Sequence, residues 1–291
     1  MEKINKHQLK HDFVNSIVII NCMVKSASTI IKHFTTAQNT TINQKQIENF
    51  LYAMDAIQVQ TAKIENYFNI LNGETSSSTS KKKEYYDLTT PVTPKTIVYP
   101  GDPAFSIETI VSLENGDPFH LCHMHLSNHT GTHIDFPAHV IKGGKTSKDY
   151  SIDDLIGSGL IIEVPDTEKS ITKSFIETQH SITQNDFIFF KTSNSKLSKQ
   201  TAFTEKYVYI EPEAAEELIR KGIKIVGIDY INVDSYDAAD LPVHHSFLSN
   251  NILIVEGLEL NEIPEGRYTI YIMPNNIPDM DGLPSRVIAK S

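Results

Sequence analysis

The sequence predicts an α/β domain preceded by an all-α helical hairpin. Three observations lead to this prediction: heptad-spaced apolar seams in the first quarter of the chain, a polar run from Gly73 to Lys83, and short β-rich runs broken by Pro and Gly after it. The chain has 291 residues, of which 40% are hydrophobic and 21% charged, so it can bury a core. We therefore expect a helical hairpin over 1–72, a flexible linker over 73–84 and a folded domain over 85–291.

The predicted hairpin rests on two seams with alternating steps of three and four residues. The seam residues are Phe13, Ile17, Ile20, Val24, Ala27, Ile31 and Phe34, and then Ile47, Phe50, Met54, Ile57, Thr61, Ile64, Phe68 and Leu71. The polar segment Thr35–Asn43 can turn the chain between them. Two narrow apolar stripes are poorly buried within one hairpin, whereas two copies would form a four-helix bundle. We therefore predict a homo-oligomer, at least a dimer.

One segment of the hairpin suggests a second role. His11-Asp12-Phe13-Val14-Asn15-Ser16, at the start of the first helix, resembles the H-box of sensor histidine kinase dimerisation and phosphotransfer domains. His11 lies off the a/d positions and would be exposed, as a phosphoacceptor is. A His-acid pair on a helix is common, however, and no ATP-binding domain follows, so a hairpin that only oligomerises is the favoured interpretation.

The remainder of the chain alternates β-rich runs with turns, and one helix is clearly marked. The expected strands are Thr96–Tyr99, Phe105–Leu113, Gly159–Val164, Phe187–Lys191, Tyr207–Ile210, Ile223–Ile228, Ile252–Val255 and Tyr268–Met273. The helix is Pro212–Lys221, with Pro in its first turn, basic residues at its end and Gly222 after it. Strands with occasional helices indicate a compact α/β or α+β domain.

Charge and composition exclude several classes of protein. Residues 1–83 hold 10 Lys and 6 acidic residues, so the rest of the chain carries 16 basic and 30 acidic residues, which argues against a nucleic-acid partner. No apolar run approaches the ~20 residues of a membrane span. Two distant cysteines, Cys22 and Cys122, form no disulfide framework, and a reducing cytoplasm is the expected location.

Half of the chain's 12 histidines lie between His120 and His139. Among them, His129, His133, Asp135 and His139 follow the pattern H-x3-H-x-D-x3-H. Imidazoles and a carboxylate are suitable ligands for Zn²⁺ or Mn²⁺, and such a mixed set does not choose between them. If the segment is extended, His133 and Asp135 share one face. The pattern therefore predicts a metal site. His120, His123 and His125 are expected to have structural roles, although their spacing would allow some of them to hydrogen-bond to the metal ligands.

A further pair, His244-His245, precedes Glu256 at the end of the apolar run Ile252–Val255. A carboxylate at the end of a buried strand is costly unless it is paired or bound to metal. Glu256 is therefore a candidate ligand.

These residues resemble the cyclase family, whose best-known members are bacterial kynurenine formamidases, with isatin hydrolase among their relatives. The resemblance covers about residues 85–291 and includes the histidine pattern in the form H-x-G-T-H-x-D-x-P-x-H. The other elements, in the family's order, are Asp87-Leu88-Thr89, Val98-Tyr99-Pro100-Gly101-Asp102, Pro212-Glu213-Ala214-Ala215, Gly227-Ile228-Asp229, His244-His245, Val255-Glu256-Gly257-Leu258 and Asp281-Gly282-Leu283-Pro284-Ser285-Arg286.

The resemblance implies roles for the candidate residues. His129, His133 and Asp135 would bind one divalent metal, Asp135 and Glu256 would bridge to a second metal that His244 also binds, and His139 would be the general acid/base. The metal would be Zn²⁺ or Mn²⁺, with one or two ions per subunit. The implied fold is a swivelling β/β/α arrangement around a central β structure, assembled as a homodimer or larger oligomer.

Chemistry and resemblance together predict a metal-dependent hydrolase that cleaves the C–N amide bond of a small aryl-formamide or cyclic amide. Formamidases of the family commonly have Trp before Pro-Gly-Asp, where this chain has Tyr99, and the chain contains no Trp. Tyr99 would keep an aromatic wall for the substrate with a different area and polarity. The alternative is a regulatory or sensory protein, in which the cyclase-like domain binds a small metabolite and the hairpin dimerises or is phosphorylated at His11.

Overall fold

The computed structural model describes residues 20, 64, 84–197, 200 and 202–291. The chain divides into two units, residues 1–82 and 83–291, and the second unit is described below. Nearly all of the predicted hairpin over 1–72 and of the linker over 73–84 lies outside the described residues, as does the candidate phosphoacceptor His11, and these stay predictions.

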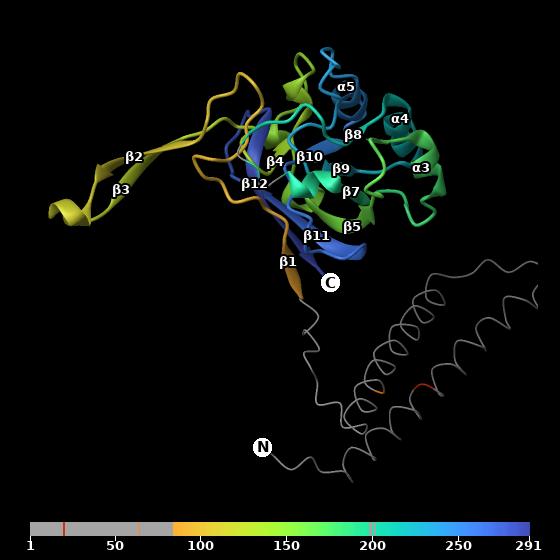
Figure 1. Ribbon diagram of the computed structural model, residues 1–291, viewed down its shortest axis with the longest axis horizontal. Coiled ribbons are helices and arrows are strands. Elements are labelled where there is room, and N and C mark those ends of the chain that lie inside the picture. The colour runs from red at the N-terminus through yellow and green to blue at the C-terminus, as the bar shows by residue number, and fades with distance from the viewer. Residues whose placement is uncertain (1–19, 21–63, 65–83, 198–199, 201) are drawn as a thin grey trace, which may run out of the picture. The chain divides into compact units, whose positions relative to one another are not determined.

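The second unit is built on an eight-stranded mixed sheet in the order β1-β12-β11-β5-β7-β9-β10-β4 (Figure 1). Its strands are β1 (Tyr85–Asp87), β4 (His133–Asp135), β5 (Ile156–Glu163), β7 (Phe187–Lys191), β9 (Ile225–Ile228), β10 (Leu253–Glu256), β11 (Gly266–Pro274) and β12 (Gly282–Lys290). The run from β5 to β10 is parallel and the other pairs are antiparallel. Because β4 pairs with both β10 and β12, it closes seven of the strands into a ring.

Successive side chains of each strand point to opposite faces of the closed sheet, and the apolar ones form one cluster on each face. In β7, Phe187 and Phe189 point into the ring, where they pack with residues of β4, β10, β11 and β12. Ile188 and Phe190 point outward, beneath helices α3 (Lys173–Thr178), α4 (Pro212–Lys221) and α5 (Pro242–Ser249). These helices gather on one side of the sheet (Figure 1).

Two small sheets and several short turns complete the unit. Strands β2 (Ser106–Val111) and β3 (Leu121–His125) form a hairpin that extends away from the central sheet (Figure 1), and β6 (Ser170–Ile171) pairs with β8 (Tyr209–Ile210). Short 3₁₀ helices lie at Leu113–Asn115, Pro137–His139, Ser147–Asp149, Ile152–Asp154 and Ser193–Lys196. In the part of the chain that the structure describes, no helix has both the length and the apolar character needed to cross a membrane.

The predicted α/β class of residues 85–291 is confirmed. Helix Pro212–Lys221 is also confirmed, and Gly222 ends it in the left-handed conformation with φ of 75°. The predicted strand Thr96–Tyr99 is wrong. A turn ends at its first residue, where the Thr93 amide donates to Thr96 Oγ1 at 2.7 Å and the Thr96 amide donates to the Thr93 carbonyl at 2.9 Å, and residues 96–99 then run in irregular conformation without pairing to a strand.

Candidate active site

Strand β4 places two candidate ligands on the outer face of the closed sheet. Ile134 points into the ring, so His133 and Asp135 point to the opposite face, which confirms that they share a face. Glu256 on β10 lies directly opposite His133 in the antiparallel register. The three side chains are buried, with at most 3% of each residue exposed.

The backbone fixes the orientation of the His133 ring. Its Nδ1 lies 2.9 Å from the carbonyl oxygen of Gly131, which only accepts, so Nδ1 carries the proton and donates it. In the neutral ring the lone pair is therefore on Nε2. This atom lies 3.4 Å from Asp135 Oδ1 and 3.4 Å from Glu256 Oε2. The lone pair of His133 Nε2 and the oxygens of the two carboxylates thus face one another, as ligand atoms around one metal ion do.

His244 on α5 lies near the other oxygen of each of the same two carboxylates. Its Nδ1 lies 2.6 Å from Asp234 Oδ2, and Asp234 also accepts from the backbone amides of Val243 and His244 at 2.8 and 3.1 Å. The other ring nitrogen, Nε2, lies 3.4 Å from Glu256 Oε1 and 3.6 Å from Asp135 Oδ2. Asp234 therefore anchors one edge of the ring and turns the other edge to the carboxylates.

One buried carboxylate oxygen of the cluster makes no hydrogen bond with the described residues. Asp135 Oδ2 is inaccessible to solvent and makes no hydrogen bond with any described residue. A buried carboxylate oxygen without a hydrogen bond is costly, and a bound cation would offset that cost. The surrounding donors are two imidazole nitrogens and a second carboxylate, a set that suits a divalent transition metal. The residues present therefore fit a metal.

His129 joins the cluster because a glycine leaves space for its ring. Its Nδ1 lies 2.9 Å from Asp135 Oδ1, and its Nε2 lies 3.2 Å from Asp281 Oδ2. A Cβ added to Gly282 would lie 2.3 Å from Cε1 of this ring, closer than real contacts allow. Gly282 begins β12, opposite Asp135, so the β4–β12 pairing brings this gap to the site.

His139 lies at the more open edge of the cluster. Its ring packs on that of His129 with centroids 4.2 Å apart, and its Nδ1 lies 3.3 Å from Asp281 Oδ2. About 26% of its side chain is exposed, against 2% for His133. Ligand-type atoms of Asp135, His139 and His244 lie within 4.8 Å of one another. His139 is therefore both close to the ligand set and open to an incoming molecule.

The charges in this cluster shift one another's proton affinities. Burial would lower the pKa of His129, but Asp135 and Asp281 raise it to about 9. Burial would also lower the pKa of His244, but Asp135, Asp234 and Glu256 raise that pKa well above the usual range. Burial would raise the pKa of Asp135, but the neighbouring histidines hold it well below the ordinary value. Without metal, protons on the histidines balance the buried carboxylates.

The five predicted ligands and His139 thus come together, and two further residues join them that the sequence reasoning did not assign. Asp281 faces both His129 and His139, and Asp234 anchors His244. Asp281 begins the Asp-Gly-Leu-Pro element that resembles the family, so the sequence held a signal for it. Asp234 had no such signal. His123 and His125 lie instead on the exposed β2–β3 hairpin.

Tyr99 belongs to a cluster of aromatic rings beside the site. Its ring meets that of Phe203 at a centroid distance of 5.4 Å, and Phe203 meets Tyr207 at 6.2 Å. The Tyr207 hydroxyl donates to the backbone carbonyl of Asp234 at 2.8 Å. Burial, together with the charge of Glu256 and other neighbours, raises the pKa of Tyr207. The aromatic cluster therefore reaches from Tyr99 to the segment that anchors His244.

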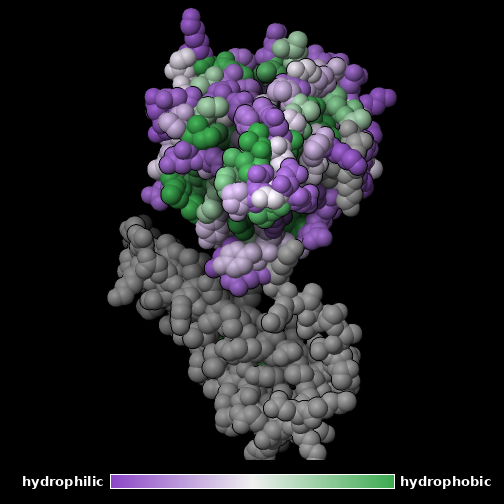
Figure 2. Space-filling view, turned by 90° about the vertical axis from the view of Figure 1, so that its left-hand side faces the viewer, coloured by the Kyte–Doolittle hydropathy of each residue, from purple (hydrophilic) through white to green (hydrophobic). Residues whose placement is uncertain are grey.

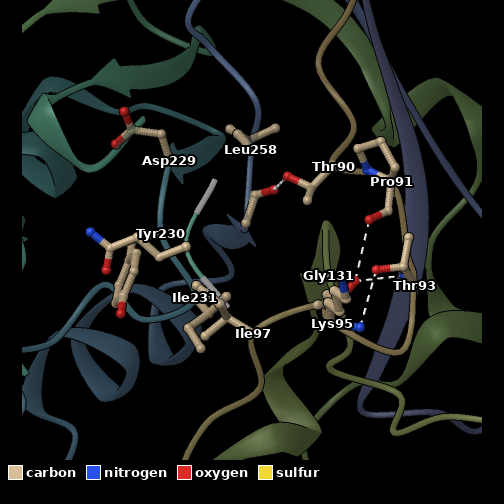
Figure 3. A pocket seen from close by; sticks show the side chains of 13 residues that line it. Thr90, Pro91, Thr93, Lys95, Ile97, Gly131, Asp229, Tyr230, Ile231 and Leu258 are labelled. Atoms are coloured by element: carbon tan, nitrogen blue, oxygen red, sulfur yellow. Dashed lines mark hydrogen bonds between the residues drawn. The ribbon is translucent and has the colours of Figure 1, made fainter. Parts of the chain in front are cut away.

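A cavity of about 250 Å³ is lined in part by Gly131 and Gly257, close in sequence to His133 and Glu256 (Figure 3). Lys95, Asp229 and Tyr230 contribute to its wall, and none of the five candidate ligands does. Burial raises the pKa of Asp229 to about 6, although four hydrogen bonds from Thr192 and Ser195 oppose that rise. The cavity borders the backbone of the site and not its ligand atoms.

Comparison with known sequences identifies relatives of this chain. The sequence model of the Cyclase family matches residues 86–235. A kynurenine formamidase of Salinibacter ruber is 33% identical over 205 residues, which cover 70% of this chain and 96% of that protein. A kynurenine formamidase of Bacillus cereus is 31% identical over 210 residues, which cover 72% of this chain and 99% of that protein.

Solved structures show the same fold. A protein of Bacillus stearothermophilus described as a predicted metal-dependent hydrolase aligns with a TM-score of 0.61 and 31% identity, covering 70% of this chain and 97% of that one. An isatin hydrolase bound to the product analogue thioisatinate aligns with a TM-score of 0.64 over 80% of this chain and 98% of that one. Its identity is 22%, so this likeness concerns the fold alone.

Proposed function

The chain belongs to the Cyclase family, and from this membership we propose that it is a metal-dependent hydrolase that cleaves the C–N bond of a small amide. One observation of the site carries the proposal. The Nε2 atoms of His133 and His244 converge on the carboxylates of Asp135 and Glu256, and one oxygen of Asp135 makes no hydrogen bond with any described residue. Such a set has the composition of a metal centre.

We assign the ligand roles as follows. His129, His133 and Asp135 would hold one divalent ion, and His244 with Glu256 would complete the site or hold a second ion that shares Asp135. Zn²⁺ and Mn²⁺ both suit this mixture of nitrogen and oxygen donors. When bound, the metal supplies a water activated for attack at neutral pH and polarises the carbonyl group of the amide.

The protein's own residues would then move protons. His139 lies at the open edge of the ligand set, within reach of Asp135 and His244, and we assign it as the general acid/base. Asp281 supports this role because its Oδ2 lies 3.3 Å from His139 Nδ1 and orients the ring. The opposite ring nitrogen remains free to accept a proton from water and return one to the leaving nitrogen.

The aromatic cluster supports an aryl substrate. Tyr99 contacts Phe203 and lies 6.4 Å from the Tyr236 ring between centroids, and flat apolar surfaces of this kind favour stacking with an aromatic ring. An aryl-formamide or a cyclic amide fused to a ring would place its ring against this cluster and its carbonyl near the carboxylates. Tyr99 is the residue we assign to this contact.

A panel of substrates tests the proposal. The purified full chain, supplied with Zn²⁺ or Mn²⁺, should hydrolyse at least one aryl formamide, cyclic imide or isatin-like lactam. Asp135→Asn should abolish this activity, whereas Asp153→Asn, a matched change at an exposed residue, should retain it. An inactive wild type on every amide, or equal activity of the two variants, would contradict the proposal.

Four further features remain predictions. Assembly through the hairpin over 1–72 into at least a dimer rests on the two apolar seams, and phosphorylation of His11 remains the alternative sensory role. The swivelling β/β/α arrangement of residues 85–291 and a cytoplasmic location are likewise proposed from the sequence.

A further inference from the structure

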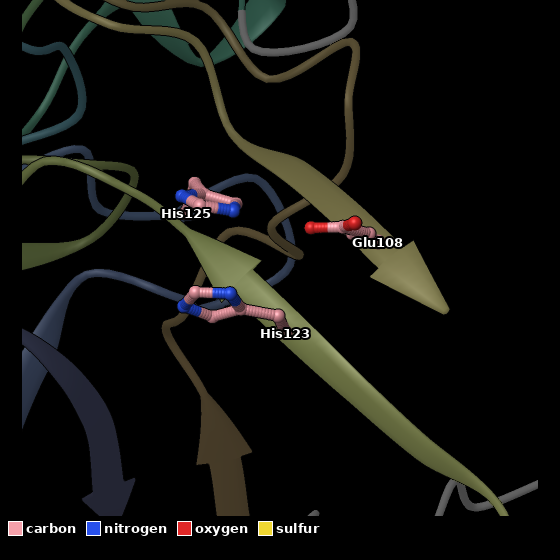
Figure 4. Close-up of side chains that lie close together, drawn as sticks. All are labelled: Glu108, His123 and His125. Atoms are coloured by element: carbon pink, nitrogen blue, oxygen red, sulfur yellow. The ribbon is translucent and has the colours of Figure 1, made fainter. Parts of the chain in front are cut away.

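The β2–β3 hairpin carries a second group of metal-type side chains, away from the ligands described above. Glu108 lies on β2, and His123 and His125 lie on β3. All three residues are exposed, and they offer ligand atoms that lie within 4.8 Å of one another. The carboxylate of Glu108 turns toward the two imidazoles (Figure 4).

The register of the hairpin explains why the three side chains converge. Glu108 and His123 are direct partners in the antiparallel pair, and directly opposite side chains on one face are neighbours. His125 is two residues beyond His123, so it points to the same face of β3. The His123 and His125 rings lie with centroids 4.2 Å apart and an interplanar angle of 40°. The backbone pairing therefore sets this arrangement.

We propose that Glu108, His123 and His125 form a separate binding site for a borderline-soft divalent transition metal such as Zn²⁺. Two imidazoles and one carboxylate are a preferred zinc set, with water in the fourth position. Ligand atoms around tetrahedral zinc lie ~3.4 Å apart, so the exposed side chains need only small rotations to close on the ion. Mg²⁺ and Ca²⁺ prefer oxygen ligands and should bind poorly.

Metal binding at this site would join β2 to β3. A two-stranded hairpin is marginally stable alone, and this one extends from the central sheet with exposed apolar residues such as Ile107 and Met124. Figure 2 views the molecule from the side on which the hairpin projects, and green apolar residues lie there among purple polar ones. An ion that binds only the paired strands stabilises that pairing. The site would therefore hold the hairpin in one conformation.

Zinc stoichiometry of the full chain tests the proposal. In equilibrium dialysis at neutral pH, the wild type should bind one more Zn²⁺ per chain than His123→Ala, His125→Ala or Glu108→Gln. His180→Ala and Glu114→Gln are matched controls at exposed positions outside the group, and they should bind as much as the wild type. Equal zinc content in the wild type and His123→Ala would overturn the proposal, and wild-type content in Glu108→Gln would overturn the role of the carboxylate.

Two readouts separate this site from the proposed catalytic centre. His133→Ala should still bind the hairpin ion, and His123→Ala should hydrolyse any amide substrate at the wild-type rate when metal is saturating. Zinc should also slow hydrogen exchange of amides in residues 106–125 of the wild type and of His180→Ala, but not of His123→Ala. If zinc left the exchange rates of these amides unchanged in the wild type, the hairpin site would be contradicted, even if amide hydrolysis is confirmed.

Discussion

Asp234 Oδ2 lies 2.6 Å from His244 Nδ1, and this contact determines which nitrogen of the imidazole faces the buried carboxylates. Carboxylates behind metal-binding histidines orient the ring and fix its tautomer. Asp234 is itself held by the amides of Val243 and His244, so the orientation comes from the first turn of α5. The helix thus positions a ligand atom through its own backbone.

Asp234→Asn should weaken metal binding without removing any ligand. The amide can present an N–H where the carboxylate accepts, which favours the wrong tautomer of His244. We expect affinity for Zn²⁺ or Mn²⁺ to fall by about 10- to 100-fold. Competition with a chromophoric chelator measures the change, and Asp237→Asn in the same loop is the control. Unchanged affinity would show that Asp234 does not position His244.

His139→Ala should slow catalysis and leave bound metal in place. General acid/base groups typically contribute about 10²- to 10⁴-fold to the rate, so kcat should fall by that range. Metal content by elemental analysis should match that of His180→Ala. A variant with the wild-type rate would exclude His139 as the proton carrier, and one that lost its metal would make His139 a ligand.

Gly282→Ala should act through the ring of His129, because the added methyl would lie 2.3 Å from Cε1. We expect weaker metal binding, with a loss that resembles that of His129→Ala. The double variant Gly282→Ala/His129→Ala should bind metal about as weakly as His129→Ala alone, since both changes remove the same ligand. Additive losses would place the effect of Gly282 elsewhere in the β4–β12 pair.

Metal uptake should release protons in a defined pH window. In the metal-free protein Asp135 and Asp281 raise the pKa of His129 to about 9, above the ~6.5 of a free imidazole. The stability from this contact is fully present below pH ~6.5 and is lost as the pH rises through about 9. The free energy of unfolding of the metal-free protein should therefore decrease over this range, while its metal affinity increases.

Calorimetric titration with Zn²⁺ in buffers of different ionisation enthalpy counts the released protons. At pH 7.5 the wild type should release more protons than His129→Ala. The same number from both proteins would show that His129 is already neutral at that pH.

Local patterns in the sequence predicted the parts of the site that depend on local structure. If the segment around them is extended, His133 and Asp135, two residues apart, share one face, and the position of Glu256 at the end of an apolar run made it a candidate ligand. Helix Pro212–Lys221 was predicted from Pro212 at its start and Gly222 after its end, because the effect of each on helix formation is confined to its own end of the helix.

Other features depend on pairing between distant segments. Strand β4 has only three residues, too few for a periodic signal, and it is defined by pairing with β10 and β12. Asp281 reaches His129 because of that pairing, across 152 residues of sequence. Asp234 is a loop residue whose role appears only when α5 is placed beside β10. Thr96–Tyr99 was wrongly predicted as a strand, because its β-rich composition does not supply a neighbouring strand, and the segment instead follows a turn that Thr93 and Thr96 form.

The most direct test of the account is the rate of amide hydrolysis by metal-stripped protein as Zn²⁺ or Mn²⁺ is added back. An aryl formamide or cyclic amide that the enzyme accepts serves as substrate, and free metal is buffered. The account predicts negligible hydrolysis by the stripped wild type, a rate that rises with metal and saturates, and no recovery in Asp135→Asn. Full hydrolysis by the stripped wild type, or recovery by Asp135→Asn equal to that of the wild type, would contradict it.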